Sequence, residues 1–388
     1  MSHLTMKKLL LSFLIIFNFA ACKTAKQDSK VVINRLPLTS YFKNSNLPAA
    51  LMGYSIKEGK TEWFAFGPSV WGGKDTINEN NIFRIYSMTK AIASVAALQL
   101  VEKGLIDLDA PLDELMPEMT KIPILNENGV LVEAKKSINL RQLLTHTAGF
   151  SYSFMDQNLQ KFDKPDWQYE DLPRVFEAGE SWKYGTSLDW VGKIIEKVSG
   201  ENLEDYLRKN VTGPLKMNST WFNVPENLKE NIVSWGTRNA QKFQEYQRLP
   251  AAPVALYSAG GGLFGSPKDY LTFLDCIMNN GKFEGGQLLK PETVAMMFTN
   301  QLPNNLTING EELDTHSLAW AIENSEDEVI RSKGSAYWSG LANTYYSLDQ
   351  EKEVAIVYFT NFFPFGEKET NNFYKLFQKE VYNSLKAK

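Results

Sequence analysis

The hydrophobic pattern predicts one helix that is apolar on every face. Residues Ala91 to Val101, within the stretch FRIYSMTKAIASVAALQLVEKG at 83–104, carry no charge, and Gly104 follows as a residue type that often ends helices. The run is too short to cross a bilayer, so we expect a helix buried in a folded core. Lys90, in the first turn of this helix, therefore places a charge where the pattern predicts burial.

Two further patterns lie near the C-terminus. The stretch YYSLDQEKEVAIVYF at 345–359 predicts an antiparallel hairpin. The final stretch predicts an amphipathic helix with one apolar stripe, formed by Phe373, Phe377, Val381 and Leu385.

The N-terminus has the pattern of an export signal. A pair of lysines precedes an apolar run from Leu9 to Phe19, which is followed by small residues and Cys22. This arrangement resembles the lipobox of bacterial lipoproteins, in which that cysteine is acylated and becomes the mature N-terminus. We expect a signal peptide over 1–22, a polar tether over 23–38, and a protein anchored by lipid in the bacterial cell envelope, on its periplasmic or surface face. The alternative is a cleaved secretory signal without lipid.

The composition of the chain indicates a globular protein and narrows its partners. The 388 residues are 43% hydrophobic and 22% charged, which are ordinary values. The formal net charge is -4 and no basic stripe stands out, which argues against binding to nucleic acid. No internal repeat or low-complexity tract is visible, so we expect one large domain over 39–388.

Cysteine and histidine are too scarce for most thiol and metal sites. A lipidated Cys22 leaves Cys276 without a disulfide partner, and Cys276 lies in an amphipathic helical pattern as a small core residue. The histidines are His3, His146 and His316, and His3 falls in the signal segment, so a zinc site is not expected. No metal and no cofactor are predicted, and the G-x-S-x-G motif of nucleophile-elbow hydrolases is absent.

A glycine-rich stretch, SAGGGLFGSPKDY at 258–270, lacks the ending of a phosphate-binding loop. Ser266 suits the N-cap of a helix, Pro267 its first position, and Asp269 completes the spacing of a capping box. We therefore expect a structural loop that leads into a helix.

Ser87 and Lys90 form an S-x-x-K motif, which can supply a nucleophile without histidine. A serine at a helix N-terminus lies near unpaired backbone amides and the positive end of the helix dipole. Lys90, three positions on, lies on the same face, so its nitrogen can reach the serine oxygen. Desolvation should lower the pKa of Lys90 and make it a base. The motif alone is weak, because SYFK at 40–43 also fits it and a lysine at a helix end can simply extend to solvent.

Other motifs resemble those of the serine β-lactamase and penicillin-binding-protein superfamily. The stretch FRIYSMTKAIASVAALQLVEKGLIDLDAPL is similar to its nucleophile helix, and INLRQLLTHTAGF at 138–150 is similar to its R-x-L-L-T-H-T-S-G-L sequence. AGESWKYGTSLDWVGKIIEKVSGENLEDYL, PLKMNSTWF and GGLFGSPKDYLTFLDCIMNNGKFEGGQLL resemble its later blocks, in order. The likeness covers nearly all of the chain after about residue 45, and in particular it concerns the class C β-lactamase-like group, which includes esterases and D-amino-acid peptidases.

The resemblance implies a catalytic set. Ser87 would be the nucleophile, and Lys90 and Tyr184 would share proton transfer, with the Tyr184 phenol hydrogen-bonded to both. The alternative for Tyr184 is a buried aromatic side chain. His146, at the end of a helix, is expected to be structural.

A third motif of the superfamily, K-T-G, has its counterpart in Trp338, Ser339 and Gly340. The resemblance places these residues on a strand at the edge of the active site, where Gly340 would let substrate lie against the strand. The backbone amides of Ser87 and Leu341 would form the oxyanion hole, in which one donor contributes about 3 kcal/mol to transition-state stabilisation.

Two departures from the β-lactamase pattern concern substrate binding. Thr186 stands where these enzymes have an asparagine that positions the substrate amide, and Trp338 replaces the lysine that holds the ring carboxylate of a β-lactam. W-x-G is a form seen in esterase-like members, and Trp338 would make one wall of the pocket apolar, which suits a hydrophobic acyl or alcohol group. The predicted substrate-binding residues are Thr186, Trp338, Ser339 and Gly340.

The fold implied by the resemblance is α/β (α+β), of the β-lactamase/transpeptidase type. We expect a central antiparallel sheet flanked by helices, and a helical subdomain over roughly 100–250. The sheet would take residues 49–67, paired about the turn KEGK, and strands between about 318 and 360.

The predicted function is that of a serine hydrolase that cleaves ester or amide bonds of small molecules or peptides through an acyl-enzyme on Ser87. Among such hydrolases, the sequence favours an esterase-like enzyme. One alternative is a D,D-peptidase or β-lactamase that acts on cell-wall peptides or β-lactams. Another is a catalytically idle lipoprotein that uses the same fold to bind peptidoglycan or a partner. The joint presence of Ser87, Lys90, Tyr184 and Gly340 argues against the idle protein.

Overall fold

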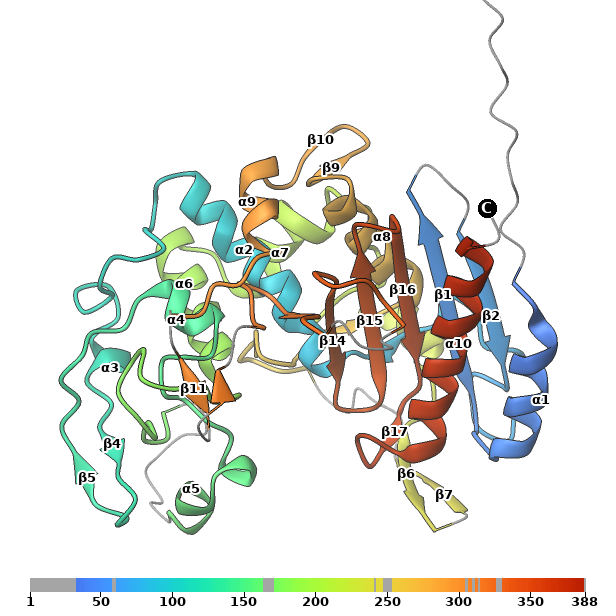
Figure 1. Ribbon diagram of the computed structural model, residues 1–388, viewed down its shortest axis with the longest axis horizontal. Helices are drawn as coiled ribbons and strands as arrows, with labels where there is room; N and C mark the ends of the chain where they lie inside the picture. Colours follow the sequence, from blue (N-terminus) through green and yellow to red (C-terminus); the bar gives the residue numbers. More distant parts are fainter. Residues whose placement is uncertain are drawn as a thin grey trace, which may run out of the picture.

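An antiparallel sheet of six strands forms one side of the molecule (Figure 1). The computed structural model describes residues 33–57, 61–162, 171–240, 242–246, 253–303, 306–308, 311–312, 315–325 and 330–386. The strands, in spatial order, are β13 (Ala321–Ile322), β14 (Ala336–Gly340), β15 (Thr344–Asp349), β16 (Val354–Phe359), β1 (Ala50–Ile56) and β2 (Glu62–Phe66). The predicted sheet is confirmed, while most of the KEGK turn lies outside the described residues.

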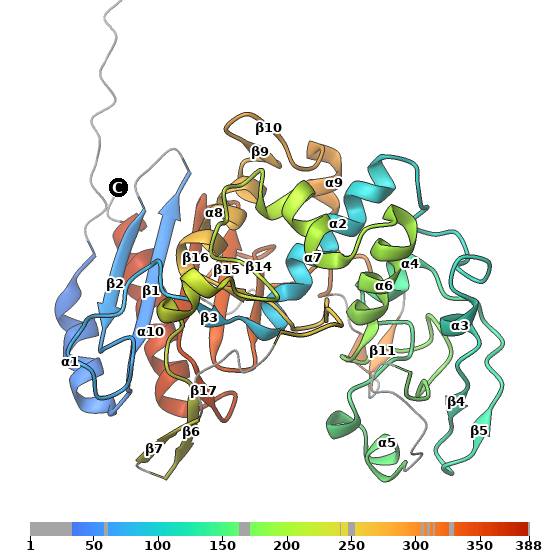
Figure 2. The same cartoon turned by 180° about the vertical axis from the view of Figure 1, so that it is seen from behind.

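Two terminal helices, α1 (Arg35–Ser45) and α10 (Lys368–Lys386), cover one face of this sheet (Figures 1 and 2). The predicted apolar stripe of α10 is confirmed: Phe373, Phe377 and Val381 are buried, and Phe377 meets the ring of Phe64 at 5.4 Å. The face of α10 that points to the sheet thus follows directly from its sequence periodicity.

Helix α1 begins before the expected start of the folded domain. Asn34 caps it by accepting a hydrogen bond from the backbone N–H of Leu36, and Ile33 and Leu38 are buried. The expected boundary between tether and domain at residue 39 is therefore too late, because apolar residues inside the expected tether pack on the sheet. Residues 1–32, with the expected signal and Cys22, lie outside the described residues.

The opposite face of the sheet packs on α8 (Pro267–Met278), and α2 (Thr89–Glu102) continues the same core. Every residue of α2 from Thr89 to Leu100 is buried, and Gly104 has a left-handed φ of 66° just beyond the helix. The expected buried helix is confirmed. Cys276 on α8 is also buried, and burial raises the pKa of its thiol to about 12.

A mainly helical part lies beside the sheet (Figure 2). Its helices are α3 (Pro117–Thr120), α4 (Leu140–Leu144), α5 (Gln157–Lys161), α6 (Ser187–Ser199) and α7 (Leu203–Leu207), with the hairpin β4 (Ile124–Leu125) and β5 (Leu131–Val132). Elsewhere lie β3 (Phe83–Arg84), β6 (Gly236–Asn239), β7 (Lys242–Glu245), β8 (Phe264–Gly265), β9 (Lys282–Phe283), β10 (Gly286–Gln287), α9 (Pro291–Met296), β11 (Thr307–Ile308), β12 (Glu311–Glu312) and β17 (Phe362–Phe363).

Within the part of the chain that the structure describes, none of the helices has both the length and the apolar character needed to cross a bilayer.

The packing of α10 makes a testable prediction. Phe377→Ala should lower the free energy of unfolding by about 3–5 kcal/mol, because it removes a buried ring and leaves a cavity beside Phe64. Lys379→Ala, on the exposed side of the same helix, should change it by less than about 0.5 kcal/mol. Urea denaturation of both variants measures this, and similar costs for the two would contradict the packing.

Candidate active site

Ser87 lies in a short turn, Tyr86–Met88, directly before α2. Two hydrogen bonds to the backbone hold this turn from both sides. The N–H of Ile85 donates to the Leu263 carbonyl at 3.1 Å, and the Tyr270 hydroxyl donates to the Met88 carbonyl at 3.0 Å. Tyr86 has a left-handed φ of 45°, a conformation that is strained for a bulky residue. The serine is therefore presented by a backbone that its neighbours hold in place.

Lys90 is 2% exposed, and its ammonium group donates three hydrogen bonds. Its Nζ donates to Ser87 Oγ at 3.3 Å, to the Tyr152 hydroxyl at 3.0 Å and to the Gly260 carbonyl at 2.6 Å. An ammonium has three N–H donors, so these three acceptors satisfy it. The expected contact between Ser87 and Lys90 is present in the structure.

The expected direction of the Lys90 pKa shift is wrong. Burial lowers the pKa of Lys90, but Coulombic interactions with Tyr152, Tyr184 and Asp189, and the hydrogen bond to Tyr152, outweigh burial and raise it above its ordinary value. The sequence showed the apolar helix, whereas the opposing groups come from distant parts of the chain. In the resting site Lys90 donates three hydrogen bonds, as an ammonium does.

Tyr152 is a site residue that the sequence analysis missed. Its hydroxyl accepts the Lys90 hydrogen bond, and its ring stacks on Phe154 with centroids 5.2 Å apart. Burial raises the pKa of Tyr152 to about 12, although the nearby Lys90 charge acts in the opposite direction. A signal was available, since Tyr152 follows the motif at 138–150 by two residues.

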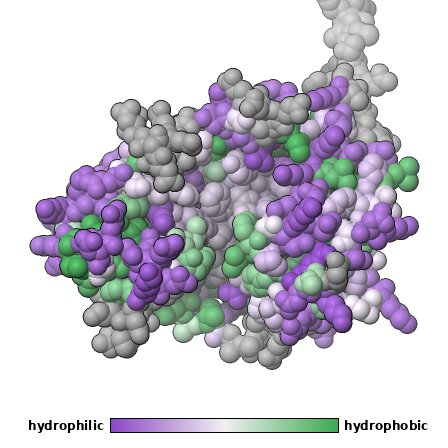
Figure 3. All heavy atoms as spheres, turned by 60° about the horizontal axis from the view of Figure 1, so that its bottom comes forward, coloured by the Kyte–Doolittle hydropathy of each residue, from purple (hydrophilic) through white to green (hydrophobic). Residues whose placement is uncertain are grey.

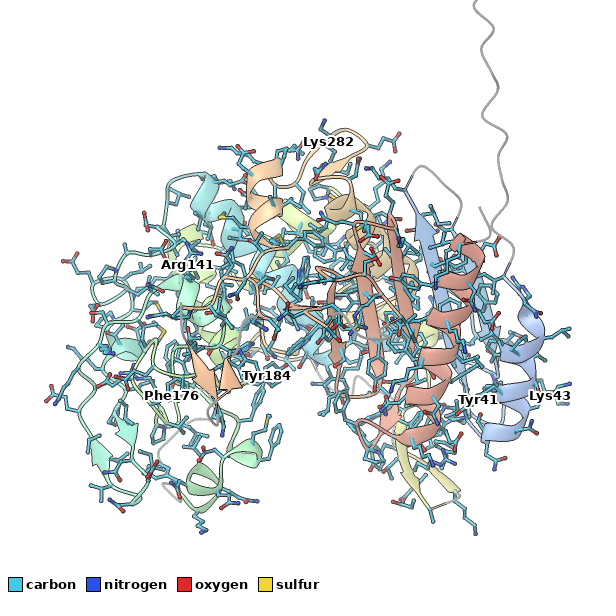
Figure 4. The ribbon with its side chains drawn as sticks, viewed as in Figure 1. Tyr41, Lys43, Arg141, Phe176, Tyr184 and Lys282 are labelled. Atoms are coloured by element: carbon cyan, nitrogen blue, oxygen red, sulfur yellow. The ribbon has the colours of Figure 1, made fainter. Side chains whose placement is uncertain are left out.

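Tyr184 lies beside this group but does not make the expected hydrogen bonds to Ser87 and Lys90. The Lys90 ammonium lies 4.7 Å from the centre of the Tyr184 ring, an attractive cation–π contact. The Tyr184 hydroxyl is buried and has no hydrogen-bond partner among the described residues. Figure 4 shows Tyr184 on the helical part, on the side that faces the sheet.

The second S-x-x-K match takes no part in this arrangement. Lys43 lies on α1 at the edge of the molecule, whereas Tyr184 lies near its middle (Figure 4).

The glycine-rich stretch at 258–270 contributes to the site as well as to the fold. Ser266 caps α8, as expected, by accepting a hydrogen bond from the N–H of Asp269 at 3.1 Å. The contact of this loop with Lys90 was not predicted: the carbonyl of Gly260 accepts the shortest of the Lys90 hydrogen bonds, at 2.6 Å.

Of the predicted substrate-binding residues, Trp338 and Ser339 line the cavity of about 820 Å³ that contains Ser87. Leu341 lines it too, in the turn between β14 and β15. Thr186 is 1% exposed at the N-cap of α6, and it is not among the residues that line this cavity. Gly340 is buried as well: a Cβ at this position would meet the Ile85 carbonyl oxygen at 2.3 Å, so the glycine serves the close packing of β14 against the segment before Ser87.

The walls of the cavity are rich in aromatic and apolar side chains from both parts of the molecule. Phe154 is 64% exposed and Leu341 is 42% exposed at its edges. Figure 3 shows hydrophobic side chains on both sides of the hollow between the two parts. The apolar lining residues are Tyr86, Tyr152, Phe154, Met155, Trp182, Tyr184, Tyr337, Trp338, Leu341, Tyr345, Tyr346, Phe365 and Tyr374.

His146 and His316 lie behind this wall and are neutral. Burial lowers the pKa of His146 well below its ordinary value, with further contributions from His316 and Lys90, and burial lowers the pKa of His316 to about 3. The His146 ring packs against Tyr184 at 4.8 Å, which supports the orientation of that ring. In the described ranges no group of three His, Cys, Asp or Glu residues could hold a metal ion.

Comparisons with known proteins identify the family and the fold. The chain matches the family model described as Beta-lactamase over residues 54–379. It is 30% identical over 361 residues to acyltransferase calJ of Penicillium decumbens, covering 82% of this chain and 85% of the relative. It is 31% identical over 262 residues to lovastatin esterase of Penicillium rubens, covering 60% and 62%. A mutant simvastatin synthase of Aspergillus terreus has a similar structure, with a TM-score of 0.82 and 25% identity over 90% of this chain and 95% of that one.

The two tyrosines should differ in their effect on stability. Tyr152→Phe removes an acceptor from the buried Lys90 ammonium and should lower the free energy of unfolding by about 1–3 kcal/mol. Tyr184→Phe removes a buried hydroxyl without a described partner and should raise the free energy of unfolding, by about 1–3 kcal/mol. Chemical denaturation of both variants tests the assignment of contacts, and a larger cost for Tyr184→Phe would reverse it.

Proposed function

The chain belongs to the β-lactamase family, and we propose that Ser87 is its nucleophile. Relatives named as acyltransferases and as an esterase identify the protein as a serine hydrolase with an acyl-enzyme mechanism and esterase-like activity. The observation that carries the assignment to Ser87 is the contact of its Oγ with a buried ammonium, Lys90, at 3.3 Å inside the cavity. Catalytic relatives favour this activity over an idle binding protein.

The proton acceptor for Ser87 is Tyr184 in this proposal. Lys90 is an ammonium that donates to Ser87, and the Tyr152 hydroxyl already accepts from Lys90. The Tyr184 hydroxyl is buried without a described partner, and a buried hydroxyl gains free energy when substrate completes its hydrogen bonding. The Lys90 ammonium lies 4.7 Å from the centre of the Tyr184 ring, so it favours negative charge on the Tyr184 oxygen when that oxygen accepts the Ser87 proton.

Acylation then proceeds with a closed proton balance. The Ser87 oxygen attacks the carbonyl carbon of the ester, its proton passes to the Tyr184 oxygen, and the carbonyl electrons move to the oxyanion. The bond from carbon to the alcohol oxygen breaks, and Tyr184 returns the proton to the leaving alcohol. Water, or a second alcohol, attacks the acyl-enzyme by the same route and gives an acid or a new ester.

The backbone amides of Ser87 and Leu341 are the proposed oxyanion hole. Both residues line the cavity, and Leu341 lies in a turn held by a backbone hydrogen bond from Asn343 to Gly340 at 3.0 Å. The Thr360 hydroxyl also donates to the carbonyl of Asn343, at 2.9 Å. A donor on a rigid turn needs no reorganisation when negative charge develops, which is the condition for electrostatic catalysis.

The proposed substrates are small-molecule esters with an apolar acyl or alcohol group. Trp338 stands in the cavity wall where a lysine of β-lactamases would hold a carboxylate, and its ring lies 5.3 Å from that of Tyr184. An aromatic wall favours apolar surface over an anionic ring system. Peptides and β-lactams are therefore the less favoured substrates.

Activity and covalent labelling test this proposal together. We expect the wild type to hydrolyse short-chain p-nitrophenyl esters and to bind a fluorophosphonate at Ser87, and Ser87→Ala to retain less than about 10⁻⁴ of the rate and no label. Ser40→Ala, in the second S-x-x-K match, is the matched control and should behave as wild type. Nitrocefin and D-Ala-D-Ala peptides should be poor substrates. Labelling at another residue would refute the site, and efficient nitrocefin cleavage would refute the substrate class.

We also propose that the protein is exported and anchored by lipid on Cys22. The support is the sequence alone: a basic start, an apolar run of signal-peptide length, and small residues before the cysteine. An active site on a folded domain after residue 33 would then lie close to the membrane surface of the cell envelope.

Fractionation of bacterial cells tests the anchor. The wild type should remain with membranes and incorporate labelled fatty acid, whereas Cys22→Ala should lose the label and leave the membrane fraction. Cys276→Ala, which changes the other cysteine, should keep both properties. Membrane retention of Cys22→Ala would contradict the lipid anchor.

A further inference from the structure

Asp189, on the first turn of α6, is bound to the loop that carries the Lys90 acceptor. Its Oδ1 accepts a hydrogen bond from the Ser258 hydroxyl at 2.6 Å and from the backbone N–H of Gly260 at 3.0 Å. The carbonyl of the same glycine accepts the hydrogen bond from Lys90 at 2.6 Å. The Asp189 carboxylate thus binds the backbone N–H of Gly260, and the Lys90 ammonium binds its carbonyl.

Gly260 fits this position because it has no side chain. A Cβ on residue 260 would lie 2.5 Å from Asp189 Oδ2 and 2.9 Å from Oδ1, closer than real Cβ contacts allow. Any larger residue would push the carboxylate and the loop apart. The glycine is thus an independent sign that the close approach of Asp189 to this loop is built into the site.

We propose that Asp189 is a positioning residue, which holds the Gly260 carbonyl on Lys90 and so directs the ammonium toward Ser87. The inference rests on the proposed function of Ser87 and Lys90. Asp189 contacts neither Ser87 nor Lys90 in the hydrogen bonds described, and it acts through the loop at 258–260. A small shift of a group that positions the nucleophile can cost about 10²-fold in rate.

Asp189 also contributes charge. The titratable groups that act on Lys90 are Tyr152 from the loop after α4, Tyr184 from the loop before α6, and Asp189 from α6 itself. His146, at the end of α4, faces Lys90 as a neutral ring. The Asp189 carboxylate raises the pKa of Lys90 and of Tyr152, so both residues hold their protons to higher pH.

An acidic residue in the first turn of a helix often has only a structural role, because its charge interacts favourably with the helix dipole and stabilises the helix. Asp205 offers a matched control, because it is the third residue of α7 as Asp189 is of α6. Asp205 is exposed and pairs with Asn202, away from the cavity. Asp205→Asn therefore removes the same kind of helix-terminal charge without touching the Lys90 loop.

The experiment separates charge from position in the full-length protein. Asp189→Asn keeps an acceptor but loses the charge, so Lys90 and Tyr152 should release their protons more readily. The rising limb of the pH profile of kcat/KM should therefore move to lower pH by about one pH unit. Asp189→Ala loses the acceptor as well and should lower kcat by about tenfold or more at its optimum. Gly260→Ala should lower kcat similarly, and Asp205→Asn should match the wild type in both measurements.

The outcomes distinguish this inference from the proposed function. Folding of each variant is checked by thermal unfolding, and Gly260→Ala replaces Asp189→Ala as the test of position if the latter does not fold. If the Asp189→Asn profile superimposes on that of an active wild type, or if removing the Asp189 contact leaves more than half of kcat, the inference is wrong. If the wild type neither turns over esters nor labels at Ser87, the proposed function itself fails.

Discussion

The buried ammonium of Lys90 is the constraint on which the site depends. A charge with 2% exposure is strongly destabilising unless each of its N–H donors has an acceptor. The acceptors come from three separate segments: the turn of Ser87, the loop of Tyr152, and the glycine-rich loop at Gly260. These segments belong to different parts of the molecule, so the lysine is satisfied only when all three meet at its Nζ.

Two features that cost stability lie close to Ser87. Tyr86 has a strained left-handed backbone directly before Ser87, and the buried Tyr184 hydroxyl has no described partner. Both features cost stability in the resting protein, and the large core behind α2 offsets them. A substrate that completes the hydrogen bonding of Tyr184 would recover part of that free energy, so the cavity favours occupation by a molecule with a polar oxygen at this point.

The sequence predicted those features that local periodicity determines. The uncharged run predicted the buried helix α2, and the 3.6-residue stripe predicted the buried face of α10. The resemblance to the superfamily implied the sheet, and the S-x-x-K spacing placed Lys90 beside Ser87. Tyr152, Gly260 and Asp189 were missed because their contacts join residues 62 to 170 positions apart. The pKa of Lys90 was wrong for the same reason: burial can be inferred from the helix, but the opposing charges are set by the tertiary structure.

The replacement of lysine by Trp338 links substrate preference to the state of Lys90. A second cation in the K-T-G position would lower the pKa of Lys90 by repulsion and would also attract an anionic substrate. Trp338 is neutral and packs its ring against Tyr184 and His316, at 5.3 Å and 5.5 Å. With no cation there, nothing at this position opposes the phenols and Asp189, which accords with the raised pKa of Lys90. Trp338 therefore makes this part of the cavity wall aromatic and places no second cation beside Lys90.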